Sequence, residues 1–339
     1  MIYLQKFSSM NKKLKTAIKI ILFVGFGIAI FMLVYKDFDF GNFFDTMSAI
    51  KWGWLIPAAL ISLLSHISRA RRWQLLLETT GEKPRFINTF FAVLNAYFAN
   101  LAVPRLGEVT RCALISRYEK QDFSKVLGTV VSERLLDLML VAILTVVAFA
   151  TQASVFSDFI AQHPEIEDNI SKIFSPLTIT ILAVVGITGL CLLIVIAKGK
   201  LDRFKICQKI SKFINGLWTG ILSIKNAQHK VGIIFNSFLI WTLYFLMLYF
   251  CFFAFEELSG LNVLAALMLF VAGSFGMIVP SPNGMGSYHF MIIQTLIIYG
   301  IPSETGASFA LVAHGLQTVL VIVFGLFATI LIPVVNKDK

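Results

Sequence analysis

Charged residues are scarce in this sequence. Asp, Glu, Lys and Arg make up 14% of the 339 residues, whereas a soluble domain contains about 25%. Hydrophobic residues make up 57%, and several apolar runs reach the roughly 18 residues that can cross a hydrocarbon core as a helix. This composition excludes an ordinary soluble domain and predicts an all-α polytopic membrane protein.

Signatures of nucleotide, metal and redox chemistry are missing as well. The sequence contains no G-x-x-x-x-G-K-[ST] loop and no dinucleotide-binding fingerprint. Its four cysteines show no C-x-x-C spacing, so they indicate neither a zinc site nor a disulfide framework. We therefore predict no catalytic residue, no metal site and no cofactor. Energy for any transport would come from a gradient, a partner or the supply of substrate.

The net charge of +10 agrees with the positive-inside rule, by which Lys and Arg gather in cytoplasmic loops. No motif supports a nucleic-acid partner. Basic residues precede the first apolar run and follow the last one. The pattern predicts a multi-pass protein of the cell membrane with both termini in the cytoplasm. It predicts six full membrane-spanning helices at about 16–35, 52–68, 124–150, 177–197, 231–255 and 306–332.

Two further apolar stretches are interrupted by Pro and Gly. The stretch at 86–103 has basic residues at both ends and is followed by Pro104 and Gly107, which favours a hairpin that enters and leaves on the cytoplasmic side. The pieces at 262–279 and 287–300 flank a break from Pro280 to Gly286. A second re-entrant hairpin, entering from outside, would keep the last helix in its predicted direction. Two complete crossings would do so too.

The order of elements therefore repeats with opposite orientation. Each half reads helix, helix, interrupted hairpin, helix, which is the pattern of an inverted-topology repeat. We expect one integral membrane domain over 1–339, with half-repeats at 1–150 and 177–335. An external loop would occupy 151–176, and a basic cytoplasmic segment 198–230.

Ionisable residues gather around the first break. They are costly near a bilayer, at about 2.5–3.5 kcal/mol each at a helix centre on insertion scales. One hypothesis is that the arginines hold a lipid phosphate while the carboxylates orient them. The alternative is that the charges pair at the cytoplasmic interface. The candidate substrate-binding residues are Asn100, Arg105, Glu108, Arg111, Glu133, Arg134 and Asp137, together with Asn283 and His289 at the second break.

Other polar residues receive simpler interpretations. The basic-aromatic run Arg69, Arg71, Arg72 and Trp73 is interpreted as an anchor at the membrane interface, with attraction of lipid headgroups as the alternative. His314 and Gln317 lie within the last helix, where interhelical hydrogen bonding is the more frequent role for such a pair.

Four of these features together resemble the flippase-like membrane family, also called the lysylphosphatidylglycerol synthase transmembrane region. The resemblance covers nearly the whole chain. It is carried by Arg-Ala-Arg-Arg-Trp at 69–73, Asn100 with Pro104-Arg105-Leu106-Gly107-Glu108 and Arg111, Glu133-Arg134 with Asp137, and the break from Pro280 to Gly286. Relatives often place Glu shortly after the second break, where this chain has His289.

The resemblance implies lipid movement between leaflets without the soluble aminoacyl-transfer domain of two-part relatives. We therefore predict a flippase-like transporter for a phosphate-headgroup lipid: a phospholipid, an aminoacyl-phospholipid or a polyprenyl-phosphate. The main alternative is a membrane-embedded lipid-modifying enzyme or synthase accessory subunit, and a third class is a scaffold for a cell-envelope complex. The expected partner is a membrane lipid with an anionic headgroup. A lipid-synthase partner and a homo-oligomer remain open.

Overall fold

The structure is a computed structural model that describes residues 27–36, 47–80, 83–162 and 227–337, with a few single residues outside these ranges. All regular elements in these described ranges are helical, as the composition predicted. From Trp52 onward the elements are η1 (Trp52–Trp54), α4 (Leu55–Leu77), η2 (Glu78–Thr80), α5 (Phe86–Ala102), α6 (Leu106–Tyr118), α7 (Phe123–Thr151), α8 (Ala153–Ala161), α12 (Lys230–Phe252), α13 (Glu256–Ser259), α14 (Val263–Ile278), η3 (Pro282–Gly284), α15 (Ser287–Ile298) and α16 (Ser303–Val335).

Three of these helices, α7, α12 and α16, are long and apolar enough to cross a membrane. They match the helices predicted at 124–150, 231–255 and 306–332 to within a few residues. The helix predicted at 177–197 and nearly all of the basic segment at 198–230 lie outside the described residues. The segment predicted as an external loop begins with the short helix α8.

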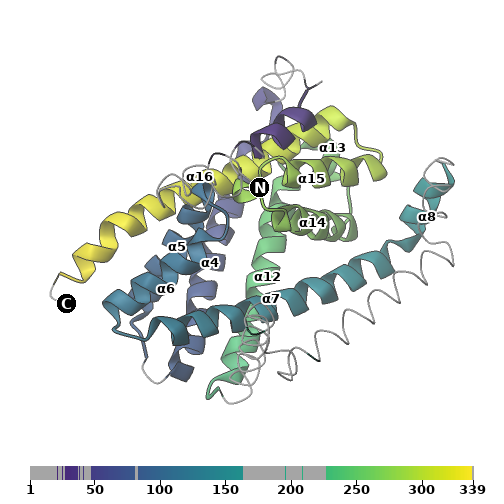
Figure 1. Ribbon diagram of the computed structural model, residues 1–339. Helices are drawn as coiled ribbons and strands as arrows, with labels where there is room; N and C mark the ends of the chain where they lie inside the picture. The colour runs from purple at the N-terminus through teal and green to yellow at the C-terminus, as the bar shows by residue number, and fades with distance from the viewer. Residues whose placement is uncertain are drawn as a thin grey trace, which may run out of the picture.

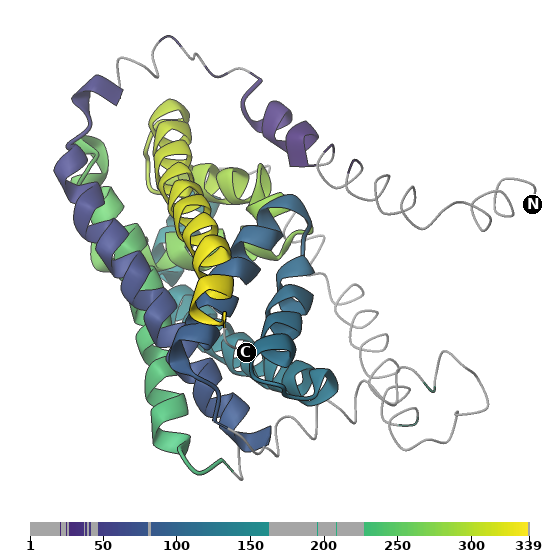
Figure 2. The ribbon, with the colours of Figure 1, turned by 90° about the vertical axis from the view of Figure 1, so that its left-hand side faces the viewer.

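Helix α4 differs from the prediction at its end. The helix was expected to stop before Arg69, yet it continues through the basic run to Leu77. It packs along α12 over most of its length, and Figures 1 and 2 show the two side by side. Arg69 and Arg72 of the basic run therefore lie within the packed protein, where they pair with acidic residues.

The first interrupted stretch forms a hairpin in which α5 and α6 pack against each other. Gly107 permits this approach, because a Cβ there would lie 2.1 Å from the carbonyl oxygen of Ala96. At the break, Arg105 has a left-handed backbone with φ 66°. The Pro/Gly signal thus predicted the turn correctly, while re-entry into the membrane stays a prediction.

The second interrupted stretch forms a similar hairpin from α14 and α15, joined through η3. Here Gly276 lies against the other helix, and a Cβ at this position would be 2.7 Å from the Cα of Tyr288. Helix α16 packs against both hairpins, along α5 on one side and α15 on the other. The second break is therefore largely buried, whereas Arg105 and Leu106 at the first break are exposed.

Candidate functional site

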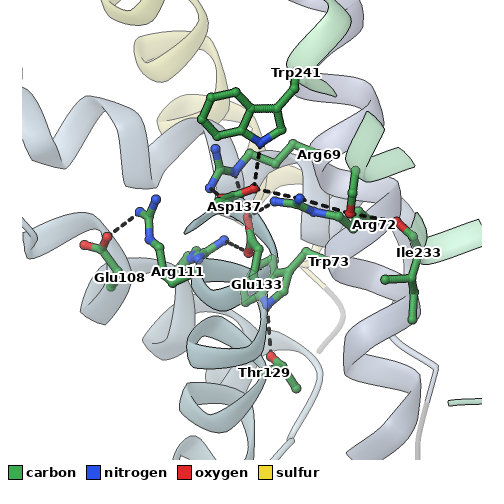
Figure 3. A network of polar contacts seen from close by, with 12 residues as sticks. Arg69, Arg72, Trp73, Glu108, Arg111, Thr129, Glu133, Asp137, Ile233 and Trp241 are labelled. Carbon is green, nitrogen blue, oxygen red and sulfur yellow. Dashed lines mark hydrogen bonds and ion pairs between the residues drawn. The ribbon is translucent and has the colours of Figure 1, made fainter. Parts of the chain in front are cut away.

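Three arginines meet two carboxylates where α4, α6 and α7 come together (Figure 3). Arg69 Nε lies 2.8 Å from Glu133 Oε1, and Arg111 Nη1 lies 2.6 Å from Glu133 Oε2. Arg72 donates to Asp137 Oδ1 over 2.7 Å and to Glu133 Oε1 over 3.1 Å. A single carboxylate, Glu133, thus contacts arginines from two other helices. We call these five residues the arginine–carboxylate cluster.

The spacing along each helix explains the cluster. Arg69 and Arg72 are three residues apart on α4, and Glu133 and Asp137 are four apart on α7, so each pair shares one helix face. The side chains of Arg72 and Glu133 are 0% exposed. A buried ion pair is costly to desolvate and costly to break, since removal of one partner typically destabilises a protein by about 3–5 kcal/mol.

Aromatic residues on α4, α5 and α12 hold the cluster through hydroxyl and indole groups. The hydroxyls of Tyr97 and Tyr244 lie 2.7 Å apart, and Arg69 Nη1 donates to both, over 2.7 Å and 3.1 Å. Trp241 Nε1 donates to Asp137 over 3.3 Å (Figure 3). The guanidinium of Arg111 stacks over Trp73, with Cζ 4.6 Å from the ring centroid. These contacts fix the orientation of each charged group.

A small cavity of about 20 Å³ lies beside the cluster. At its edge, Arg134 on α7 forms an ion pair with Glu108 on α6, and the Arg134 side chain is 49% exposed. Within the described part of the chain, Arg111 Nη2 and Glu108 Oε2 are buried and have no hydrogen-bond partner. The cavity is lined by Arg69, Val93, Ala96, Tyr97, Asn100, Glu108, Arg111 and Arg134.

Most of the first-half candidates therefore lie in or beside one site. Arg111, Glu133 and Asp137 belong to the cluster, and Glu108 and Arg134 close its edge. Asn100 has a local role, because its Oδ1 accepts a hydrogen bond from Gly107 N over 2.7 Å and so fixes the hairpin turn. Arg105 is exposed at the break and is not among the residues that line the cavity.

The candidates from the second half lie in a separate place. His314 Nε2 is 2.8 Å from the carbonyl oxygen of Asn283, and Asn283 Nδ2 donates to Thr318 over 3.0 Å. His289 Nδ1 accepts from Gly286 N over 3.2 Å, and its ring lies 4.8 Å from that of His314. These contacts fasten the second break to α16, which agrees with the interhelical bonding predicted for His314.

The interface-anchor interpretation of the basic-aromatic run was wrong for three of its four residues. Arg69, Arg72 and Trp73 are buried, and only Arg71 is exposed. Arg69 and Arg72 are the members of the site that sequence reasoning missed. Their signal was present in the spacing, since two acids on one face of α7 require cations on a facing helix.

The long apolar helices and the buried ion pairs between them are features of a multi-pass membrane protein with an internal polar site. The chain belongs to the lysylphosphatidylglycerol synthase TM region family, whose sequence profile matches residues 17–325. It is similar to a UPF0104 membrane protein of Methanocaldococcus jannaschii, with 23% identity over 303 residues that cover 84% of this chain and 87% of that protein. No solved structure matches the chain. The family resemblance drawn from the sequence is confirmed.

Proposed function

We propose that this protein moves a phosphate-headgroup lipid between the leaflets of its membrane, with the headgroup held beside the arginine–carboxylate cluster. The observation that carries the proposal is the charge count at the site. Four guanidinium groups (Arg69, Arg72, Arg111 and Arg134) face three carboxylates (Glu108, Glu133 and Asp137), which leaves one positive charge.

An uncompensated positive charge within a largely buried site favours an anionic ligand. Guanidinium groups match the oxygens of a phosphate in geometry and charge. A single phosphodiester brings one negative charge to this site. Phospholipids, aminoacyl-phospholipids and polyprenyl-phosphates all carry a phosphate in their headgroup.

The surface of α7 supports a lipid rather than a soluble anion. Asp137 points into the cluster (Figure 3), while the next two side chains, Leu138 and Met139, are 60% and 62% exposed. One helix thus places a headgroup site and an apolar surface for acyl chains within a single turn. A soluble anion would require no such apolar surface.

The present cavity admits only about one water molecule, because one probe sphere occupies roughly 10–15 Å³. A headgroup therefore requires the cavity to widen, and this needs α5 to move relative to α4, α6 and α7, because these four helices supply the lining residues. The two interrupted hairpins and the inverted repeat predicted from the sequence would supply such movement, as in transporters built from opposed halves.

A lipid-modifying enzyme or synthase accessory subunit is the alternative, because the family name refers to a synthase. Glu133 and Asp137 both accept hydrogen bonds from arginines, which suits them as fixed counter-ions. A general base must instead be free to accept a proton from its substrate. The cluster therefore favours transport over catalysis. It also favours transport over a scaffold role, because a scaffold needs no internal ionic site.

Leaflet-resolved lipid assays in proteoliposomes test the proposal. Movement of unmodified labelled phospholipid supports transport, whereas a new lipid product supports the enzyme. Arg111→Lys keeps the charge but removes the planar fork, so it should lower transfer at least severalfold. Arg117→Lys on the exposed side of α6 is the matched control. Equal transfer by wild type and Arg111→Lys, with Arg134→Lys also unchanged, would contradict the proposal.

A further inference from the structure

We propose that Glu108 occupies the place of the lipid phosphate in the empty protein and leaves Arg134 when a headgroup binds. This inference rests on the proposed function and assigns an exchangeable counter-ion to the same site. It follows from a difference between the carboxylates. Glu133 is fully buried and contacts three arginines, whereas Glu108 pairs, among the described residues, with Arg134 alone.

The contacts of Glu108 are incomplete. One of its oxygens pairs with Arg134, and the other, Oε2, is buried without a hydrogen-bond partner in the described part of the chain. One helical turn further along α6, Arg111 likewise has a buried nitrogen, Nη2, without a partner there. A donor and an acceptor therefore remain unpaired on two residues that line one cavity.

A phosphate would resolve this arrangement. Its oxygens accept hydrogen bonds from guanidinium groups as a carboxylate does, so it can take Arg134 from Glu108 and the free nitrogen of Arg111 together. Arg111 also keeps its bond to Glu133 through Nη1. The exchange therefore needs no break in the buried cluster.

The position of Glu108 permits the exchange. It lies in the first turn of α6, three residues after the left-handed Arg105 and beside the half-exposed Arg134. The Glu108 side chain is 21% exposed, against 0% for Glu133. A carboxylate at this edge can move toward water, and the buried carboxylates cannot.

The consequence is competition between Glu108 and the substrate. With Glu108→Gln, the phosphate no longer displaces a negative charge, so lipid binding should become tighter. Exposed ion pairs contribute about 0.2–1 kcal/mol, which corresponds to at most about a fivefold change in affinity. Transfer should slow, because the carboxylate no longer helps to expel the headgroup.

The test uses the full-length protein in detergent micelles and measures binding of phosphatidylglycerol by equilibrium titration, with transfer measured in proteoliposomes. Diacylglycerol serves as the lipid without a phosphate, and inorganic phosphate serves as the competitor without acyl chains. Glu257→Gln, which removes an exposed carboxylate on α13, is the charge-matched control. Glu108→Asp keeps the negative charge and tests whether the charge of this side chain sets the affinity.

We expect Glu108→Gln to bind phosphatidylglycerol more tightly than wild type, with diacylglycerol binding unchanged and with Glu108→Asp close to wild type. Weaker or unchanged binding by Glu108→Gln would overturn the exchange. If Arg111→Lys and Arg134→Lys still lose affinity in that case, the proposed function stands without it. If neither arginine variant loses affinity, both proposals fail.

Discussion

Arg72 on α4 lies at hydrogen-bond distance from both Glu133 and Asp137 on α7, and its side chain is 0% exposed. The pair Arg72–Asp137, at 2.7 Å, joins residues 65 positions apart in the sequence. It also brings the middle of α7 against α4, so the ionic contact that builds the site is at the same time a helix-packing contact.

The first prediction concerns this buried network. Glu133→Gln leaves three arginines short of a counter-ion, so the protein should lose about 3–5 kcal/mol of stability, the usual cost of an uncompensated buried charge. Thermal unfolding of the purified protein in detergent measures the loss. Glu257→Gln on α13 should unfold like the wild type. Equal melting of Glu133→Gln and wild type would show that the arginines find other partners.

The second prediction concerns the close approach of α5 and α6. Gly107→Ala places a Cβ against the backbone oxygen of Ala96, so one helix must shift, at a cost of about 1–3 kcal/mol. Gly128→Ala on α7 is the matched control, because a Cβ there meets nothing within 4 Å. The control should be neutral or stabilising by up to about 1 kcal/mol.

Melting temperatures of the two alanine variants give the comparison directly. A Gly107→Ala protein as stable as Gly128→Ala would contradict the packing of this hairpin.

The third prediction concerns the tyrosine pair that holds Arg69. Tyr97→Phe and Tyr244→Phe each remove a hydrogen bond to a charged group, which contributes about 1.5–3 kcal/mol. Because the two hydroxyls also bond to each other, their effects should be non-additive in a double-mutant cycle. Chemical unfolding of the four proteins measures the coupling. Strict additivity would mean that the hydroxyls act independently.

The fourth prediction concerns the first hairpin and the membrane. Cysteines introduced at the exposed positions Lys83 and Arg117, before α5 and near the end of α6, should react with a membrane-impermeant reagent from the same side. The native Cys112 is buried and would be removed from the background, with the other three native cysteines. Labelling from opposite sides would make α5–α6 a full crossing and would remove the re-entrant hairpin from the proposal.

The sequence predicted the elements better than their contacts. Pro and Gly act locally, so Pro104 and Gly107 marked the first hairpin turn without any knowledge of the fold. The burial of Arg69 and Arg72 is different, because it depends on acids more than 60 residues away. A basic run at the predicted end of a helix is interpreted as an interface anchor as long as its acidic partners are unknown.

Residues of the same type near a break also differ in burial, and composition does not reveal this difference. Arg105 and Arg111 both follow α5 in a short basic stretch, yet only Arg111 enters the cluster. The reason is the direction of α6 after its left-handed start, which turns Arg111 toward α7 and leaves Arg105 exposed. Backbone direction after a non-helical residue cannot be read from residue type.

The three-way contact of Glu133 limits how this protein can change shape. Pulling α4, α6 or α7 apart would leave Glu133 or its arginines as unpaired ions in the protein interior, which is strongly destabilising. These three helices should therefore travel together as one block. Motion that opens a path for a headgroup would then fall to α5, which lines the cavity, together with elements such as the α14–α15 hairpin and α16. The described residues of these elements add no charge to the cluster.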